Sequence, residues 1–314
     1  MIYNSKAEYR FEDETMQNNN TISGSTSFVL ASKVKDYFQL IKFTLSFMVV
    51  FSTVISYLLA PNIRFDLLFV LLLFVAGILI CGSANAINQA LEKDTDKLMK
   101  RTASRPVASG RMSVNEAFAF AAITGALGVG MMWYFFNFQS AMLGLVSLFL
   151  YGFIYTPLKK VNSVAVLVGA LPGALPCLIG WVAATDEFSA GGWILFAIQF
   201  LWQFPHFWAI AWVAHEDYSR AGFKLLPSDK GPTKFTAVQS IMYSVMMIPV
   251  GMLPYYYGLS GMVSFWIVLV CNLWMVYMSI MLYLKMDVAS ARKVMFSSYF
   301  YLMIVFLSLY ADKA

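Results

Sequence analysis

Nine long apolar stretches recur along the chain, and this repetition constrains the fold more than any other feature. They cover residues 37–59, 66–90, 115–135, 139–157, 164–185, 191–214, 236–257, 261–284 and 293–311. Crossing about 30 Å of hydrocarbon takes roughly 20 helical residues. Since a backbone in lipid must satisfy its own hydrogen bonds, each stretch is expected to form an α-helix. The sequence therefore predicts an all-α polytopic membrane protein with nine transmembrane helices.

The composition of the remaining chain suggests where this domain begins. Hydrophobic residues make up 60% of the chain and charged residues only 12%, which is atypical of a water-soluble domain. Residues 1–35 are instead polar and mixed in charge, without the apolar segment of a signal peptide. We expect residues 1–35 to be a disordered cytoplasmic tail and residues 36–314 to be one transmembrane domain. No nucleic-acid-binding module is recognisable.

The basic residues predict the orientation of the helices, because Lys and Arg in short loops stay on the cytoplasmic side. Of the 22 basic residues, all but Arg64 and Lys313 fall in the N-terminal tail, at the entry of the first helix or in alternate loops. Those loops share one membrane face. We therefore expect a cytoplasmic N-terminus, an external C-terminus and, in a bacterial cell, a location in the inner (plasma) membrane.

A charged loop, NAINQALEKDTDKLMKRTASRPVASG, spans residues 85–110 after the second apolar stretch. Four of its polar side chains are spaced by 3, 4 and 4 residues: Asn85, Asn88, Glu92 and Asp96. If the helix continues past the membrane edge, they share one face, and such converging oxygens suit Mg²⁺ bound together with a substrate phosphate. Neighbouring basic residues could hold the rest of a diphosphate: Lys97, Lys100, Arg101 and Arg105. The alternative is a solvated loop whose charges only set topology.

A second polar stripe lies in the sixth stretch, FLWQFPHFWAIAWVAHEDYSRAGFKLLPS. Gln199, Gln203, His206 and Asp217 share a helical face. Polar side chains at membrane depth are costly, so the stripe is expected to face the bundle interior or a wet cavity. The acidic end of this helix, with Glu216 and Asp217, is predicted on the same membrane face as Glu92 and Asp96. The two acidic helix ends are therefore expected to form one site.

The segment YTPLKK places Tyr155, Lys159 and Lys160 on that same face. For Tyr155 and the Trp and Phe residues around His206, the alternative is an interfacial aromatic belt, which is the commoner use of such residues. His206 itself has two interpretations. It could contact a haem, or it could satisfy a backbone carbonyl freed by Pro205.

Paired acidic motifs after the second and sixth of nine helices resemble those of the UbiA-type intramembrane prenyltransferases. The family motif Asn-x3-Asp-x3-Asp is matched by Asn88, Glu92 and Asp96. The segments NQALEKDTDKLMKRTASRPVASG, YTPLKK, GALPGALPCLIGWVAA and WQFPHFWAIAWVAHEDYSRAGFKLLP are similar to those of the haem-farnesylating branch of this superfamily, the protoheme IX farnesyltransferases. The resemblance covers residues 36–311. Two positions depart from the pattern: Glu92 replaces an Asp, and Phe43 follows Lys42 where relatives often have Pro.

The resemblance implies a UbiA-type helix bundle that joins the farnesyl group of farnesyl diphosphate to a vinyl group of haem b, giving haem O. It implies Mg²⁺ as the cofactor and, as a possible partner, the haem A synthase that uses the product. The predicted metal ligands are Asn88, Glu92, Asp96, Glu216 and Asp217. The predicted diphosphate ligands are Lys42, Arg101, Arg105, Lys159, Lys160 and Arg220. The predicted catalytic set is Asn88, Glu92, Asp96, Lys159 and Asp217, and the predicted haem contacts are Tyr155, Trp202, Gln203 and His206.

Two other functions remain open from the sequence. A related enzyme acting on a quinone precursor or another tetrapyrrole would share the acidic motifs, although the WQFPHFW and EDYSRAG segments favour haem. A transporter could also carry nine helices with buried polar residues, but its sites typically lie at the membrane midplane. In this chain the charged groups gather at one face, which favours an active site facing the cytoplasm.

Overall fold

The computed structural model describes residues 32–228 and 230–314, and in this part of the chain the regular structure is helical apart from one isolated bridge between Ser260 and Lys313. The helices that cross the bundle are α2 (Phe43–Leu59), α3 (Leu67–Leu91), α5 (Val114–Phe135), α6 (Phe138–Phe149), α8 (Ala165–Thr185), α9 (Ala190–Val213), α11 (Lys234–Tyr256), α12 (Met262–Lys285) and α13 (Val288–Ala311). Short elements follow three of them: α4 (Lys93–Lys97), a π-helix η1 (Leu150–Tyr155) with α7 (Thr156–Leu158), and α10 (His215–Arg220).

The predicted all-α membrane fold is confirmed. Within the described residues, eight helices are long and apolar enough to cross a membrane, and a ninth span results if Ser32–Leu40 and α2, bent by 49°, count as one. Most predicted stretches agree with these helices to within two residues. The last helix is an exception: it was predicted to begin at residue 293, but α13 begins at Val288. Asp287 caps this earlier start, because its side chain accepts a hydrogen bond from the Ser290 amide at 2.7 Å.

The beginning of the domain differs from the prediction. The expected tail reached residue 35, but a helix already begins at Ser32, so residues 32–35 belong to the folded part. Residues 1–31 lie outside the described residues. The helix Ser32–Leu40 is held to the charged loop before α5 by two ion pairs, Arg111 with Asp36 at 2.8 Å and Lys33 with Glu116 at 3.1 Å.

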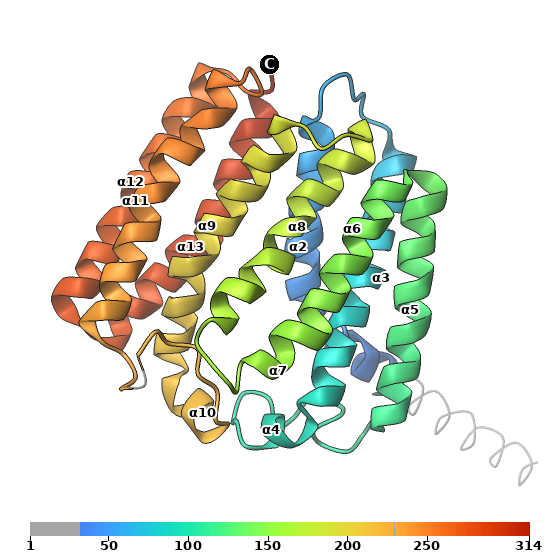
Figure 1. Ribbon diagram of the computed structural model, residues 1–314, viewed down its shortest axis with the longest axis vertical. Helices are drawn as coiled ribbons and strands as arrows, with labels where there is room; N and C mark the ends of the chain where they lie inside the picture. The colour runs from blue at the N-terminus through green and yellow to red at the C-terminus, as the bar shows by residue number, and fades with distance from the viewer. Residues whose placement is uncertain (1–31, 229) are drawn as a thin grey trace, which may run out of the picture.

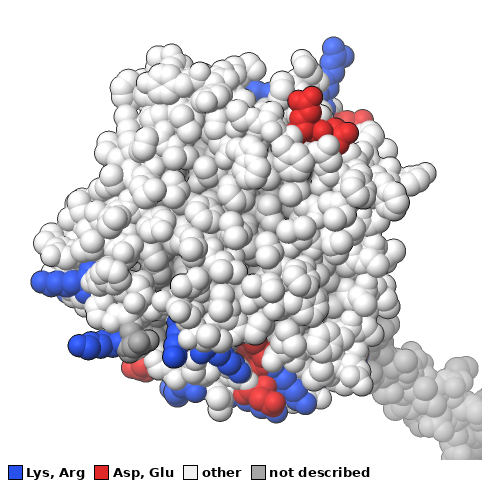
Figure 2. All heavy atoms as spheres, in the orientation of Figure 1, with Lys and Arg blue, Asp and Glu red and all other residues white. Residues whose placement is uncertain are grey.

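Two helices form the centre of the bundle, because α8 and α9 are buried along most of their length while the others face outward on one side. The helix α2 packs chiefly on α8, α3 on α5, and α11 on α12. The short elements α4, α7 and α10 lie together at one end, and the C-terminus lies at the other (Figure 1). Figure 2 shows most of the visible Lys and Arg side chains at the end that carries α4 and α10. The fold therefore places the loops that were predicted to share a membrane face at one end of the bundle.

Candidate active site

The first acidic motif lies where α3 gives way to α4. Glu92 is the junction residue, with φ −96° and ψ 11°. The helical hydrogen bonds nevertheless continue from the Glu92 amide to the Asn88 carbonyl and from the Asp96 amide to the Glu92 carbonyl. The predicted stripe is thus preserved, and Asn88, Glu92 and Asp96 are all buried, at 1%, 4% and 0% exposure. Asp94, on the other side of α4, is exposed.

Each buried acid of this motif faces a cation from a distant part of the sequence. One guanidinium nitrogen of Arg105 donates to both carboxylate oxygens of Asp96, at 2.9 and 2.8 Å. The Lys159 ammonium lies 2.5 Å from Glu92 Oε1. Each buried acid of the motif therefore pairs with a basic side chain from outside α3 and α4.

Lys159 comes from the end of the fourth span, where the helix is irregular. Residues Leu150–Tyr155 form a π-helical turn before Pro157, and such turns are frequent at functional sites. The ammonium lies over the rings of Tyr155 and Phe223, 4.9 and 5.2 Å from their centroids. Burial lowers the pKa of Lys159, and the nearby Glu92 carboxylate opposes this shift. The π-helical turn thus delivers a cation into an aromatic pocket beside the acids. Lys160, the next residue, is exposed.

Lys42 reaches the same motif from the break before α2. Its ammonium donates to Asn88 Oδ1 at 2.9 Å, and the charges nearest to it belong to Arg105, Lys159, Glu92 and Asp96. The Asn88 amide group donates in turn to Thr156 Oγ1 at 3.3 Å. Side chains from the break before α2, the end of α3, α4, the loop after α4 and the end of α7 therefore converge. They include six predicted site residues: Lys42, Asn88, Glu92, Asp96, Arg105 and Lys159.

The second acidic motif, on α10, approaches the first from across the bundle end. Asp217 pairs with Arg220, and its carboxylate faces the peptide N–H groups of Lys100 and Arg101. Partial burial alone would raise the pKa of Asp217, but Arg220 and these N–H groups outweigh it and lower that pKa. The Arg101 guanidinium also lies 6.0 Å from the ring centroid of Tyr218. The two acidic helix ends thus meet through residues 100–101, whereas Glu216 is exposed.

The predicted metal set is not gathered around one point in this structure. In the part of the chain that is described, no three acidic, histidine or cysteine side chains are close enough to share one ion. The acids pair with cations instead. Oxygen donors are nevertheless what Mg²⁺ requires, and one or two carboxylates suffice when a substrate phosphate supplies further oxygens. The buried carboxylates of Glu92 and Asp96 fit this requirement.

Three of the four predicted haem contacts, Trp202, Gln203 and His206, are buried, and each has a different polar partner or partner atom. His206 Nδ1 lies 2.7 Å from Ser298 Oγ of α13, and Trp202 Nε1 donates to the Ser298 carbonyl at 2.8 Å. The two rings stack with centroids 4.6 Å apart. Gln203 turns toward α8 and donates to the Ala170 carbonyl at 3.0 Å. The partner of His206 is therefore a serine on another helix, and not the carbonyl freed by Pro205 that the sequence suggested.

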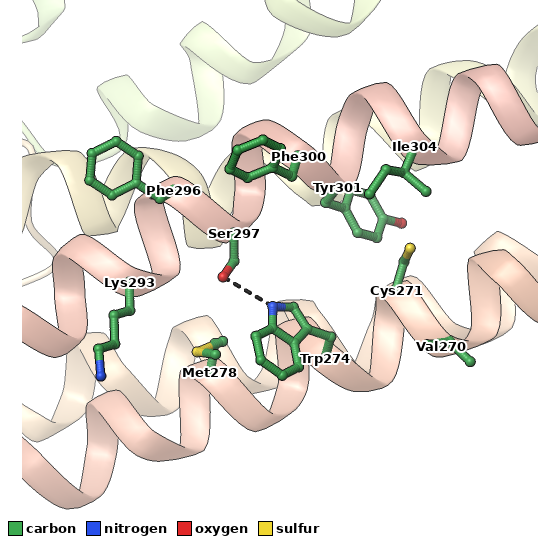
Figure 3. A pocket seen from close by; sticks show the side chains of 10 residues that line it. All are labelled: Val270, Cys271, Trp274, Met278, Lys293, Phe296, Ser297, Phe300, Tyr301 and Ile304. Carbon is green, nitrogen blue, oxygen red and sulfur yellow. Dashed lines mark hydrogen bonds between the residues drawn. The ribbon is translucent and has the colours of Figure 1, made fainter.

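Tyr155, the fourth predicted haem contact, packs against α8 at Gly169, where a Cβ atom would lie 2.6 Å from its ring. A groove of about 490 Å³ lies elsewhere, between α12 and α13, with Trp274, Phe296 and Phe300 in its wall and Lys293 at one end (Figure 3). Because no residue of the acidic motifs lines it, the site is defined by its converging charges and not by this groove.

Several residues of the site were not singled out from the sequence. Thr156 binds Asn88, Thr102 donates to the Asp96 carbonyl at 2.9 Å, and Phe223 covers Lys159. Gln89 binds the backbone before Lys42, beside Asn85 of the predicted polar stripe. A polar side chain inside an apolar run was the available signal for Gln89, whereas the threonines and Phe223 carried none.

Comparison with known proteins identifies the family of this fold and site. Residues 49–305 match the UbiA prenyltransferase family. The chain belongs to that family. A protoheme IX farnesyltransferase from Cytophaga hutchinsonii is 44% identical, with 90% of this chain and 99% of the relative covered. One from Flavobacterium psychrophilum is 42% identical, with 90% and 96% covered. The resemblance inferred from the acidic motifs and the WQFPHFW segment is confirmed.

Solved structures of UbiA-type proteins share the fold. A digeranylgeranylglyceryl phosphate synthase superposes with a TM-score of 0.74 at 22% identity, covering 90% of this chain and 98% of the other. A UbiA homolog from Archaeoglobus fulgidus, bound to GPP and Mg²⁺, gives a TM-score of 0.64 at 17% identity, with 87% and 99% covered. This UbiA-family chain is therefore a prenyltransferase by family and a polytopic membrane protein by fold.

Proposed function

We propose that this chain transfers the farnesyl group of farnesyl diphosphate to a vinyl group of haem b, giving haem O. The observation that carries the proposal is the match to protoheme IX farnesyltransferases over nearly their whole length, at 44% identity for the relative from Cytophaga hutchinsonii. The cluster of Asn88, Glu92, Asp96, Lys42 and Lys159 supports it, because a diphosphate leaving group needs such charges.

The reaction begins when the allylic carbon–oxygen bond of farnesyl diphosphate breaks and its electron pair stays on the diphosphate. The vinyl group of haem b then bonds to the allylic carbon, water supplies a hydroxyl group, and a proton is released, which leaves a hydroxyethylfarnesyl side chain. Negative charge grows on the diphosphate as the bond breaks. Fixed cations aimed at that charge stabilise the transition state more than the substrate.

The cations best placed to bind the diphosphate are Lys42, Arg105 and Lys159. Arg101 lies beside the second motif, and Lys160 and Arg220 lie at the rim. In this structure Arg105 and Lys159 neutralise Asp96 and Glu92. Arg105 and Lys159 would pair with phosphate oxygens of the bound substrate, and Asp96 and Glu92 would then hold the metal. The same pairs thus keep the buried charges compensated with and without substrate, which matters because an unpaired buried charge is costly.

Mg²⁺ is the metal that these oxygen ligands suit, and when bound it supplies positive charge to a diphosphate leaving group. Glu92, Asp96 and Asp217 are the proposed carboxylate ligands, with the Asn88 side-chain oxygen beside them. Glu216 is a weaker candidate because it is exposed. The UbiA homolog from Archaeoglobus fulgidus with Mg²⁺ and GPP supports metal-dependent prenyl transfer in this fold.

Haem b is proposed to lie against α9, near the stacked Trp202 and His206, with Gln203 and Tyr155 as further contacts. Aromatic side chains on α9, including Phe204 and Trp208, provide an apolar environment there. Such surroundings keep bulk water from the allylic cation until the vinyl group has reacted. The haem A synthase that consumes haem O is a candidate partner.

The orientation proposed is a cytoplasmic N-terminus and active site with an external C-terminus, in the plasma membrane. The collection of basic side chains at the α4 and α10 end supports it. Reporter fusions after Lys230 and after Lys313 test it. The first is expected to report a cytoplasmic location and the second an external one, and a shared location would contradict the proposal.

The function is tested by incubating the purified protein with haem b, farnesyl diphosphate and Mg²⁺ and analysing the extracted haem by mass spectrometry. A haem heavier by one farnesyl group and one hydroxyl group is expected, and it should be absent when EDTA is in excess. Quinone precursors in place of haem b provide the comparison. Product from a quinone precursor but none from haem b would overturn the proposal in favour of a different UbiA-family activity.

A further inference from the structure

We propose that Asn85 and Gln89 are positioning residues for diphosphate binding, because they hold the break before α2 and thereby place the Lys42 ammonium in the active site. The inference rests on the proposed function, since it concerns the diphosphate part of that same site. It assigns a role to two buried amides of α3 that lie next to the acidic motif but outside it.

The break itself has an unfavourable backbone conformation. The chain bends by 49° between Ser32–Leu40 and α2, and Lys42 adopts φ 48° and ψ 57°. A lysine in this left-handed region costs energy, because its Cβ atom lies close to the following carbonyl oxygen. Such a conformation persists only where the surroundings hold it. Something near the break must therefore hold it.

The amides of α3 provide that support. Gln89 Nε2 donates to the carbonyls of Gln39 and Leu40, at 3.0 and 2.9 Å, and Asn85 Nδ2 donates to the Ile41 carbonyl at 3.1 Å. These carbonyls lie at the end of a helix, where the usual intrahelical donors are missing. Both amides are almost completely buried, at 0% and 5% exposure. Three consecutive carbonyls before Lys42 are thus bound by one face of α3.

The same helix face carries the target of Lys42. Its ammonium donates to Asn88 Oδ1 at 2.9 Å, and Asn88 lies between Asn85 and Gln89 on α3, one turn before Glu92. The backbone of Lys42 and the group that it binds are therefore fixed to one rigid element. A shift of the break would change where the ammonium lies relative to the acids, and charge-assisted hydrogen bonds to phosphate depend on that position.

Attachment of the helix Ser32–Leu40 does not depend on these amides alone. Arg111 binds Asp36 at 2.8 Å, and Glu116 accepts from both Lys33 and Tyr37, at 3.1 and 3.0 Å. Removing the amide donors is therefore expected to loosen the break while the helix stays attached. This separates positioning from simple anchoring.

The test measures binding of inorganic diphosphate in the presence of Mg²⁺ by calorimetry, without turnover. Lys42→Met is expected to weaken binding roughly tenfold or more, because it removes a charge-assisted contact. Gln89→Met is expected to weaken it by a similar factor in the wild-type background but to have little further effect in Lys42→Met. That non-additivity is the signature of a residue that acts through Lys42. Asn85→Leu provides a second variant with a smaller effect, because Ser46 also binds the Ile41 carbonyl.

Ser83→Ala is the matched control. Ser83 is a buried polar residue of the same helix, and its hydroxyl donates to the Ala121 carbonyl on α5 at 2.7 Å. The variant should lower the melting temperature and leave diphosphate affinity unchanged. Unchanged affinity in Gln89→Met, or an equal loss on both backgrounds, would overturn the inference while the proposed function stands. If the wild-type protein binds no diphosphate with Mg²⁺, the proposed function fails together with it.

Discussion

The two acidic helix ends, α3–α4 and α9–α10, have the same backbone design but different surroundings. In each, a transmembrane helix ends at one residue with nearly identical dihedral angles, φ −96° and ψ 11° at Glu92 and φ −97° and ψ 17° at Ala214. A short helix with two acids in its first turn follows. In the first end, the junction residue is itself an acid. In the second it is an alanine, and no residue of α10 is buried.

The ion pairs differ in the same way. Asp96 is neutralised by Arg105, nine residues away, with side-chain exposures of 1% and 17%. Asp217 is neutralised by Arg220 on the same short helix, with exposures of 18% and 47%. A buried pair holds a site in place because breaking it leaves an uncompensated charge, whereas an exposed local pair contributes little. We infer that the first end is a preorganised half of the site and that the second is an adaptable half.

The largest effects are expected at the two central acids, and they should differ in stability more than in activity. Asp96→Asn and Asp217→Asn each remove a charged oxygen, so each should lower turnover roughly 100-fold or more. Asp96→Asn also leaves the Arg105 charge without a partner in a mostly buried position, which should destabilise the protein by about 1–3 kcal/mol. Asp217→Asn should lower the melting temperature less, because its ion pair is more exposed.

Turnover and thermal unfolding of both variants test this difference. Equal losses of melting temperature would show that the two ends are equally preorganised. Activity close to wild type in Asp96→Asn would contradict the proposed role of the first motif in binding metal and diphosphate.

A pH-dependent effect is expected at Lys159, the cation of the buried half. Burial lowers the pKa of its ammonium below the usual 10.5. Diphosphate affinity should therefore fall as the pH rises through that lowered pKa, because the neutral amine cannot hold a phosphate. The stability contribution has the opposite sign: a lowered lysine pKa favours folding most above pH 10.5, and this contribution is lost as the pH falls through the folded-state pKa.

Lys159→Arg checks this assignment, because a guanidinium stays protonated over the whole range. Affinity for inorganic diphosphate with Mg²⁺, measured from neutral pH to 10.5, should show its alkaline decline in the wild type and not in the variant. The same decline in both proteins would assign the titration to another group.

The transmembrane helices that lead to the two acidic ends also differ, and His206→Ala tests whether they bind different substrates. The α3 face carries amides near the cations proposed to bind diphosphate, whereas α9 carries the stacked Trp202 and His206. If the α9 half binds haem, His206→Ala should weaken haem binding roughly tenfold and leave farnesyl diphosphate binding nearly unchanged. Separate titrations of the two substrates measure this. An equal loss for both would indicate damage to the helix, and no loss for haem would assign His206 to its contact with Ser298.

Much of the first end could be predicted from sequence because its order is local. The spacing of Asn88, Glu92 and Asp96 determines that they share a helix face, and the apolar runs determine which end of the bundle they reach. Asp94, two residues before Asp96, lies on the other side of α4, as the helical periodicity requires. Local periodicity therefore predicted both the fold class and the acidic residues of the site.

The partners of these residues could not be predicted, because they depend on packing between distant segments. The sequence does not indicate that Arg105 binds Asp96 and not a phosphate. It also does not indicate that His206 binds Ser298, which is 92 residues away. The break at Lys42 lies inside the apolar stretch predicted over residues 37–59. The carbonyls before it are bound by amides of α3, which come from a distant part of the sequence.

The smallest effects are expected at the outer acid of each short helix, Asp94 and Glu216. Asp94 lies on the far side of α4 from Asp96, with 89% of its side chain exposed, and it binds Lys97 at 3.0 Å. That hydrogen bond lowers the pKa of Asp94, but an exposed pair of this kind contributes little to stability. Asp94→Asn should therefore keep turnover within about twofold of wild type. Glu216→Gln should behave alike if Asp217 is the ligand of the second end. A large loss of turnover in Glu216→Gln, with Asp94→Asn unaffected, would show that α10 rotates on substrate binding to present Glu216, and the second end would then be adaptable in its choice of ligand as well as in its position.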